Sequence, residues 1–168
     1  RGGREGGADD AVRADLVRRA RGATDRPLGV KLSPALPAAA RTAAAAAAAG
    51  ADAFTAVNTL PALLYGADDG APRLGSGAGG LSGPALLPVG VRVTRIVARE
   101  TGKPVIGVGG VRSGRDALQY LAAGASLVAV GTAALADPRV PERVVGELAA
   151  VAARRGARAV TELVGTGA

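Results

Sequence analysis

The sequence predicts an α/β fold built from parallel strand–helix units. Four short segments, residues 28–32, 53–57, 104–108 and 127–130, are almost continuously apolar. Strands of a parallel sheet that is covered on both faces have this composition, whereas strands with one wet face alternate apolar and polar residues. Segments of helical length separate the four, so we expect consecutive βαβ units.

A faint internal repeat supports this interpretation. Residues 48–51 and 122–125 both read Ala-Ala-Gly-Ala, and each leads into one of the apolar segments. A helix that ends on glycine and is followed by a buried strand accounts for both copies. The pattern does not separate an open doubly wound sheet from a closed barrel.

The remaining elements follow from caps and breakers. Helices are expected over residues 10–22 (starting at Asp9 or Asp10), 36–49, 86–101, 113–123 and 140–154. The whole chain is expected to be one partial domain with three irregular parts: a flexible Gly/Arg-rich start at 1–7, a long active-site loop at 60–83 and a C-terminal tail at 156–168.

Composition excludes several classes of function. The 168 residues include no Cys and no His, which excludes thiolate metal sites, Cys nucleophiles and Ser-His-Asp catalysis. The net charge is +7, but the arginines are scattered and few aromatic residues could stack bases, so we expect no nucleic-acid partner. No apolar run is long enough for a membrane span and no signal peptide opens the chain, so a cytoplasmic location is expected. The sequence starts on Arg and has no Met, which indicates a fragment.

Glycine ends two consecutive strand segments. Gly109 and Gly110 follow one, and Gly131 and Thr132 follow the next. Glycine at the carboxyl end of a strand lets a ligand approach the backbone and leaves N–H groups free for an anion. The two units together predict a phosphate-binding cup, of the kind that a (β/α)₈ barrel forms after its last two strands.

Three further groups accompany this cup. Lys31 lies within an apolar strand, where an ammonium group is costly unless it lies at a solvated site or on an open edge. Asn58 and Thr59 end the next strand and could contact a small polar ring. Ser82 and Pro84 lie where a helix begins, so Ser82 is a candidate helix cap or part of a ligand-binding nest. The acidic pairs, Asp9 with Asp10 and Asp68 with Asp69, are interpreted as solvated.

Together these motifs resemble the C-terminal half of dihydroorotate dehydrogenases of class 1, and most of all type 1B. The motifs are Val-Lys-Leu-Ser-Pro at 30–34, Ala-Gly-Ala-Asp at 49–52, Val-Asn-Thr-Leu at 57–60, Gly-Gly-Leu-Ser-Gly-Pro at 79–84, Ile-Gly-Val-Gly-Gly-Val at 106–111 and Ala-Val-Gly-Thr-Ala at 129–133. The resemblance implies about four βα units of a TIM (β/α)₈ barrel. It also implies FMN-dependent oxidation of dihydroorotate to orotate in pyrimidine biosynthesis.

The resemblance also implies roles for individual residues. Lys31, Val57 and Gly83 would contact FMN, and Gly109, Gly110, Gly131 and Thr132 would hold its phosphate. Asn58 and Thr59 would bind the orotate ring. No catalytic base is expected in this chain, because in this family the base, a Cys or Ser, lies on a loop of the N-terminal half. The isolated chain is therefore expected to bind FMN weakly and to be inactive.

Alternatives remain open at this point. The chain could be a truncated enzyme or a half-barrel that pairs with another chain. It resembles dihydropyrimidine dehydrogenase less well, and a non-catalytic flavin- or phosphate-binding module is a further possibility. Type 1B enzymes imply an NAD-linked iron–sulfur flavoprotein subunit as partner, and a homo- or hetero-oligomer is expected. Because the chain has no Cys and no His, no metal site is expected in it.

Overall fold

The computed structural model of the chain describes residues 10–34 and 39–167. Its main sheet has four parallel strands in the order β1-β2-β5-β6. The strands are β1 (Gly29–Leu32), β2 (Ala53–Ala56), β5 (Val105–Val108) and β6 (Leu127–Ala129). The main helices are α1 (Asp10–Gly22), α2 (Ala39–Ala48), α3 (Leu87–Thr101), α4 (Gly114–Ala122) and α6 (Val140–Arg154). The predicted parallel α/β fold is confirmed. The predicted flexible segment 1–7 and the predicted helix start at 36–38 lie outside the described residues.

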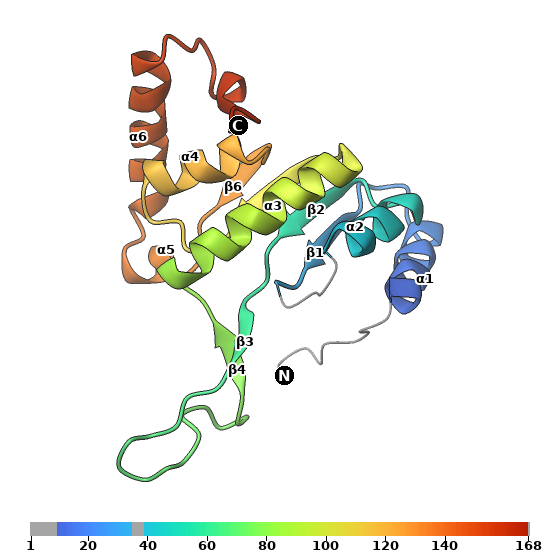
Figure 1. Ribbon diagram of the computed structural model, residues 1–168, viewed down its shortest axis with the longest axis vertical. Coiled ribbons are helices and arrows are strands. Elements are labelled where there is room, and N and C mark those ends of the chain that lie inside the picture. Colours follow the sequence, from blue (N-terminus) through green and yellow to red (C-terminus); the bar gives the residue numbers. More distant parts are fainter. Residues whose placement is uncertain (1–9, 35–38, 168) are drawn as a thin grey trace.

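The sheet has one face covered by helices and one open face. Figure 1 shows α3 crossing the sheet, with α2 and α4 beside it. Phe54 and Val105 lie on the covered face and are fully buried. On the other face, strand register aligns Lys31 with Thr55, then Ile106, then Leu127, and Leu127 is 62% exposed. Within the described chain, the expectation of two covered faces therefore holds for one face only.

Tyr120 on α4 is the largest fully buried side chain. Its ring fits because two neighbouring positions have no side chain. A Cβ atom at Gly107 would lie 2.3 Å from Tyr120 Cδ1, and one at Gly90 would lie 2.0 Å from Tyr120 Oη. The ring thus joins α3, α4 and β5 beneath the carboxyl end of the sheet.

Residues 60–83 are not the irregular loop that the sequence predicts. They form a two-stranded antiparallel ribbon of β3 (Leu60–Ala62) and β4 (Gly79–Leu81), continued by bridges between Tyr65 and Pro72 and between Leu74 and Gly77. Figure 1 shows this ribbon projecting from the body of the molecule. The many glycines, which suggested irregularity, lie at its turns and close contacts. For example, a Cβ at Gly80 would lie 2.1 Å from Thr59 Oγ1.

Two parts of the C-terminal region differ from the prediction. A short helix, α5 (Thr132–Ala136), follows β6 directly. The tail contains a 3₁₀ turn, η2 (Val160–Leu163), whose Leu163 is buried. The tail then returns to α4, because Gly165 and Gly167 donate backbone N–H groups to the carbonyls of Leu121 and Ala122. No helix among the described residues is long and apolar enough to cross a membrane.

Asp10 joins α1 to α2 and is not the solvated residue predicted from sequence. Its side chain is 24% exposed and accepts hydrogen bonds from the Thr42 hydroxyl and from Arg41 Nε at 3.0 Å, while Arg13 lies at 3.4 Å. The hydrogen bond from Thr42, followed by that from Arg41, holds the pKa of Asp10 below its usual value. Partners 31 and 32 residues away cannot be read from local spacing.

Asp52 has a similar role between α1 and β1, and it yields a prediction. Its carboxylate accepts from the Leu28 N–H at 2.7 Å and from the Arg21 guanidinium. The Leu28 hydrogen bond is the main cause that lowers the pKa of Asp52. A lowered folded-state pKa stabilises the fold above the unfolded pKa, about 3.9, and this stabilisation is lost as pH falls through the folded value.

We therefore expect Asp52→Asn to lower the urea midpoint of unfolding at pH 7. The difference in midpoint between this variant and the parent protein should shrink below about pH 4. Asp25→Asn is the control, since Asp25 is exposed and has no side-chain partner among the described residues. A gap that stays constant down to pH 2 would contradict this role of the Asp52 charge.

Candidate functional site

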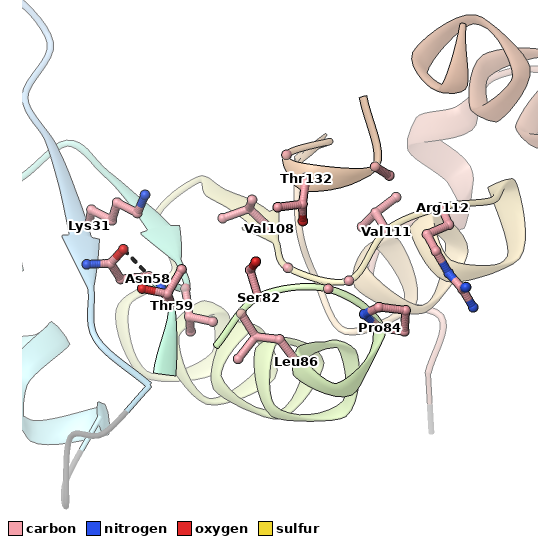
Figure 2. A pocket seen from close by; sticks show the side chains of 16 residues that line it. Lys31, Asn58, Thr59, Ser82, Pro84, Leu86, Val108, Val111, Arg112 and Thr132 are labelled. Carbon is pink, nitrogen blue, oxygen red and sulfur yellow. Dashed lines mark hydrogen bonds between the residues drawn. The ribbon is translucent and has the colours of Figure 1, made fainter. Parts of the chain in front are cut away.

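The carboxyl ends of the four parallel strands border one cavity of about 370 Å³. This is within the size range of small-molecule and cofactor sites. Every site residue predicted from sequence lines it: Lys31, Val57, Asn58, Thr59, Gly83, Gly109, Gly110, Gly131 and Thr132. Figure 2 shows the labelled members of this set arranged around the cavity, with the segment at Ser82 closing one side. Residues 100 positions apart in the sequence thus meet at one edge of the sheet.

The glycine turn after β5 needs its glycines for conformation and for space. Gly109 and Gly110 have φ of 129° and 72°, a region that side-chain-bearing residues rarely adopt. A Cβ at Gly110 would lie 2.8 Å from the Leu87 backbone N and 2.9 Å from the Gly83 carbonyl O. The turn after β5 therefore packs backbone to backbone against the segment that enters α3.

Tyr120 supports this turn from below. Its hydroxyl donates to the Gly109 carbonyl at 2.8 Å. Burial raises the pKa of the Tyr120 phenol, so the group stays protonated and remains a donor. Because this hydrogen bond holds the Gly109 carbonyl toward Tyr120, the peptide between Gly109 and Gly110 has a fixed orientation.

The far side of the turn is fixed by the start of α4. Ser113 caps this helix in a capping box with Asp116, and the Asp116 carboxylate also accepts from the Arg112 N–H at 3.0 Å. The 109–113 loop is therefore anchored at both ends. A rigid loop of this kind can present backbone donors to a ligand with little ordering cost.

Backbone donors are available at the two glycine ends. Within residues 10–34 and 39–167, no chain oxygen accepts from the N–H groups of Gly110, Gly131 or Thr132. A Cβ at Gly131 would meet nothing within 4 Å, so open space lies next to this residue. The cavity can therefore accept an anion at its glycine-lined end.

Lys31 and Asn58 lie at the opposite end of the cavity. Lys31 is exposed on the open face of β1, and no carboxylate of the described chain pairs with it. Asn58 is held by its N–H, which donates to the Leu32 carbonyl at 2.8 Å, and its Oδ1 accepts from the Thr59 N–H at 3.0 Å. Figure 2 shows both side chains at the same end of the cavity. The amide nitrogen of Asn58 remains a donor for a ligand.

Ser82 also lines the cavity, and the sequence left it open as a helix cap or as part of a ligand-binding nest. Ser82 is not a helix cap, because Gly83 occupies the cap position of the 3₁₀ turn η1 (Pro84–Leu86) and no side chain caps it. In Figure 2 the Ser82 hydroxyl instead points toward the cavity. Pro84 is at the start of the turn, as predicted. Arg112 also borders the cavity, and its position two residues after Gly110 is the only sequence signal for it.

The rest of the lining is apolar and uncharged. Val108, Val111 and Leu86 contribute side chains, and Lys31 and Arg112 are the charged residues among the described lining. Among the described residues, no Asp or Glu lines the cavity, and no group of three or more His, Cys, Asp or Glu could hold a metal ion. A flat apolar group with an anionic end fits this distribution of charge and surface.

Comparison with known proteins agrees with the geometry. The family model described as dihydroorotate dehydrogenase matches residues 1–152. The chain belongs to the dihydroorotate dehydrogenase family. This family has the TIM-barrel fold, and the four parallel strands with one open face correspond to part of such a barrel. Its members are flavin-dependent.

Curated relatives cover nearly the whole chain. A protein of Solibacter usitatus, named as a candidate dihydroorotate dehydrogenase A (fumarate), is 46% identical over 94% of this chain and 52% of its own length. The catalytic subunits of dihydroorotate dehydrogenase B (NAD(+)) from Anoxybacillus flavithermus and Desulforudis audaxviator are 38% and 43% identical, each over 98% of this chain and 53% of their own length. The chain thus spans about half the length of the curated relatives it matches.

Proposed function

We propose that this chain is the flavin-holding half of a dihydroorotate dehydrogenase, which oxidises dihydroorotate to orotate in pyrimidine synthesis with FMN as cofactor. The observation that carries the proposal is the single cavity lined by all nine residues that the family motifs select. Membership of the family and relatives that include NAD(+)-type catalytic subunits support it.

The glycine-lined end of the cavity suits the phosphate of FMN. Backbone N–H groups of Gly109, Gly110, Gly131 and Thr132 would donate to its oxygens, and the Thr132 hydroxyl would add one more donor. A Cβ at Gly131 would meet no atom within 4 Å, so there is space beside this residue for a ligand. The sequence predicted a phosphate-binding cup at these two turns, and we assign the phosphate of FMN as its ligand.

The Lys31 end suits the flavin ring and the substrate. When bound, FMN would supply a ring that can take a hydride from dihydroorotate, and a base would take the proton that the substrate loses. The Lys31 ammonium would stabilise negative charge on the reduced ring, and Val57 and Gly83 would contact the cofactor. Asn58 and Thr59 orient the substrate ring by hydrogen bonds, for which the Asn58 amide nitrogen is available.

The base that takes the proton would come from outside this chain. The sequence has no Cys and no His, and no Asp or Glu is among the described residues of the cavity lining. The relatives named catalytic subunits favour an NAD-linked iron–sulfur flavoprotein subunit as electron-transfer partner. We further propose a cytoplasmic location for the protein.

Replacing Lys31 tests the proposal. In the native protein that contains this chain, we expect Lys31→Ala to weaken FMN binding by about tenfold, because one charge interaction near the ring is lost. The measurement is a titration that follows quenching of flavin fluorescence. Arg154→Ala is the control, because Arg154 lies on α6, outside the cavity lining. Equal FMN affinity in the Lys31→Ala and parent proteins would remove Lys31 from the flavin site.

A further inference from the structure

A second cavity, of about 410 Å³, lies at the opposite, amino-terminal edge of the sheet. It opens between the carboxyl ends of α3 and α4. Pro104, which precedes β5, and the C-terminal tail also border it. Three cations line it, Arg95, Arg99 and Lys103, together with small residues such as Gly102, Gly165 and Gly167. No Asp or Glu is among the described residues that line it.

No carboxylate of the described chain forms an ion pair with a cation of this cavity. Arg95 Nη1 donates to the Gly167 carbonyl at 2.9 Å, which orients its guanidinium. In residues 10–34 and 39–167, the side chains of Arg99 and Lys103 have no hydrogen-bond or ion-pair partner. Asp52 is near enough for the Lys103 charge to lower its pKa, but its carboxylate already accepts from Leu28 and Arg21 and does not line the cavity.

The helix dipole does not explain this cluster by itself. A cation in the last turn of a helix is favourable, and Arg99 has this position in α3. Arg95 lies one turn earlier, however, and like charges four residues apart on a helix repel each other. Lys103 then adds a third positive charge beyond the helix end. An anion between them would relieve the repulsion.

Several carbonyls at the two helix ends already accept hydrogen bonds from the backbone. Gly102 N–H donates to the Ala98 carbonyl at 3.0 Å, and the Leu121 carbonyl accepts from Gly124 and Gly165. Gly167 covers the Ala122 carbonyl in the same way. Small residues also keep the cavity open, since a Cβ at Gly167 would lie 3.3 Å from Arg95 Nη1.

We propose that this cavity binds the phosphoryl group of a small anion, at a site separate from the flavin cavity. The guanidinium groups of Arg95 and Arg99 supply paired donors that suit phosphate oxygens, and Lys103 supplies a point charge. The phosphoryl group could be free, as in inorganic pyrophosphate, or part of a nucleotide. The proposal is independent of the function proposed for the first cavity.

The test is calorimetric titration of the native protein, saturated with FMN so that the first cavity is filled, with pyrophosphate and separately with a nucleoside triphosphate. We expect saturable binding of at least one of them. Arg99→Gln should weaken it by about tenfold, and Arg99→Gln with Lys103→Gln should weaken it further. Arg154→Gln on α6 is the matched control and should change the affinity little. Tighter binding of the nucleotide than of pyrophosphate would identify a nucleotide as the source, and equal binding would identify the free anion.

Two results would overturn the proposal. One is no saturable binding of either anion. The other is an equal loss of affinity in Arg99→Gln and Arg154→Gln, which would assign the binding to the net positive charge of the protein. If the protein does not take up FMN at all, comparing the anion affinities of Arg99→Gln and Arg154→Gln still shows whether the second cavity binds the anion. Circular dichroism of each variant checks that the fold is kept.

Discussion

Gly110→Ala is expected to lower the free energy of unfolding by roughly 2–5 kcal/mol, through a strained backbone and a clash with the neighbouring backbone. Gly110 has φ of 72°, and an added Cβ would lie within 3 Å of the Leu87 backbone N and the Gly83 carbonyl O. Backbone atoms cannot move aside as a flexible side chain can. The turn after β5 would have to shift, and FMN binding should fall with it.

Gly146→Ala provides the matched control for this prediction. Gly146 is within helix α6, is exposed, and an added Cβ would meet nothing within 4 Å. Alanine in an exposed helix is more favourable than glycine by about 1 kcal/mol, so this variant should be slightly more stable than the parent. Urea unfolding measures both changes. If Gly110→Ala is as stable as the parent protein, the turn after β5 does not pack closely against the backbone of Gly83 and Leu87.

Tyr120→Ala is expected to have the second large effect, a loss of about 3–5 kcal/mol of stability, as for other large aromatic residues removed from cores. The ring is fully buried between Gly90 and Gly107. The conservative variant Tyr120→Phe keeps the ring and removes only the hydroxyl that donates to the Gly109 carbonyl. It should cost about 1–3 kcal/mol, because a carbonyl that had a partner is left without one.

The two Tyr120 variants separate packing from positioning. If the hydroxyl positions the glycine turn, Tyr120→Phe should reduce FMN affinity even at temperatures where the protein is fully folded. A Phe variant with parental FMN affinity and reduced stability would assign Tyr120 to packing alone. Urea unfolding together with the flavin titration gives both readouts on the same samples.

The sequence predicted the parallel sheet and its functional edge because both depend on local signals. Short, almost continuously apolar segments predicted the strands to within one or two residues. The carboxyl ends of parallel strands lie at one edge by topology, so strand ends predicted separately were brought to one cavity. The glycine turn after β5 could be predicted from two local facts: it contains two consecutive glycines, and it follows an apolar strand segment.

Features that depend on distant partners could not be predicted in this way. The ribbon at 60–83 is stabilised by pairing between segments almost 20 residues apart, and its glycines suggested a loop. Asp10 binds residues on α2, and the tail binds the end of α4, with no periodicity to indicate either contact. Ser82 had the sequence of a helix cap, but the backbone at Gly83 turns its hydroxyl toward the cavity.

The central claim is that the glycine-lined end of the first cavity holds the phosphate of FMN, and comparing FMN with riboflavin tests it most directly. The two flavins have the same ring, and riboflavin lacks the phosphate. Fluorescence titrations of the native protein with each flavin should give FMN an affinity at least about tenfold higher, since several charge-assisted hydrogen bonds are made only by the phosphate. Equal affinities for FMN and riboflavin would contradict the claim.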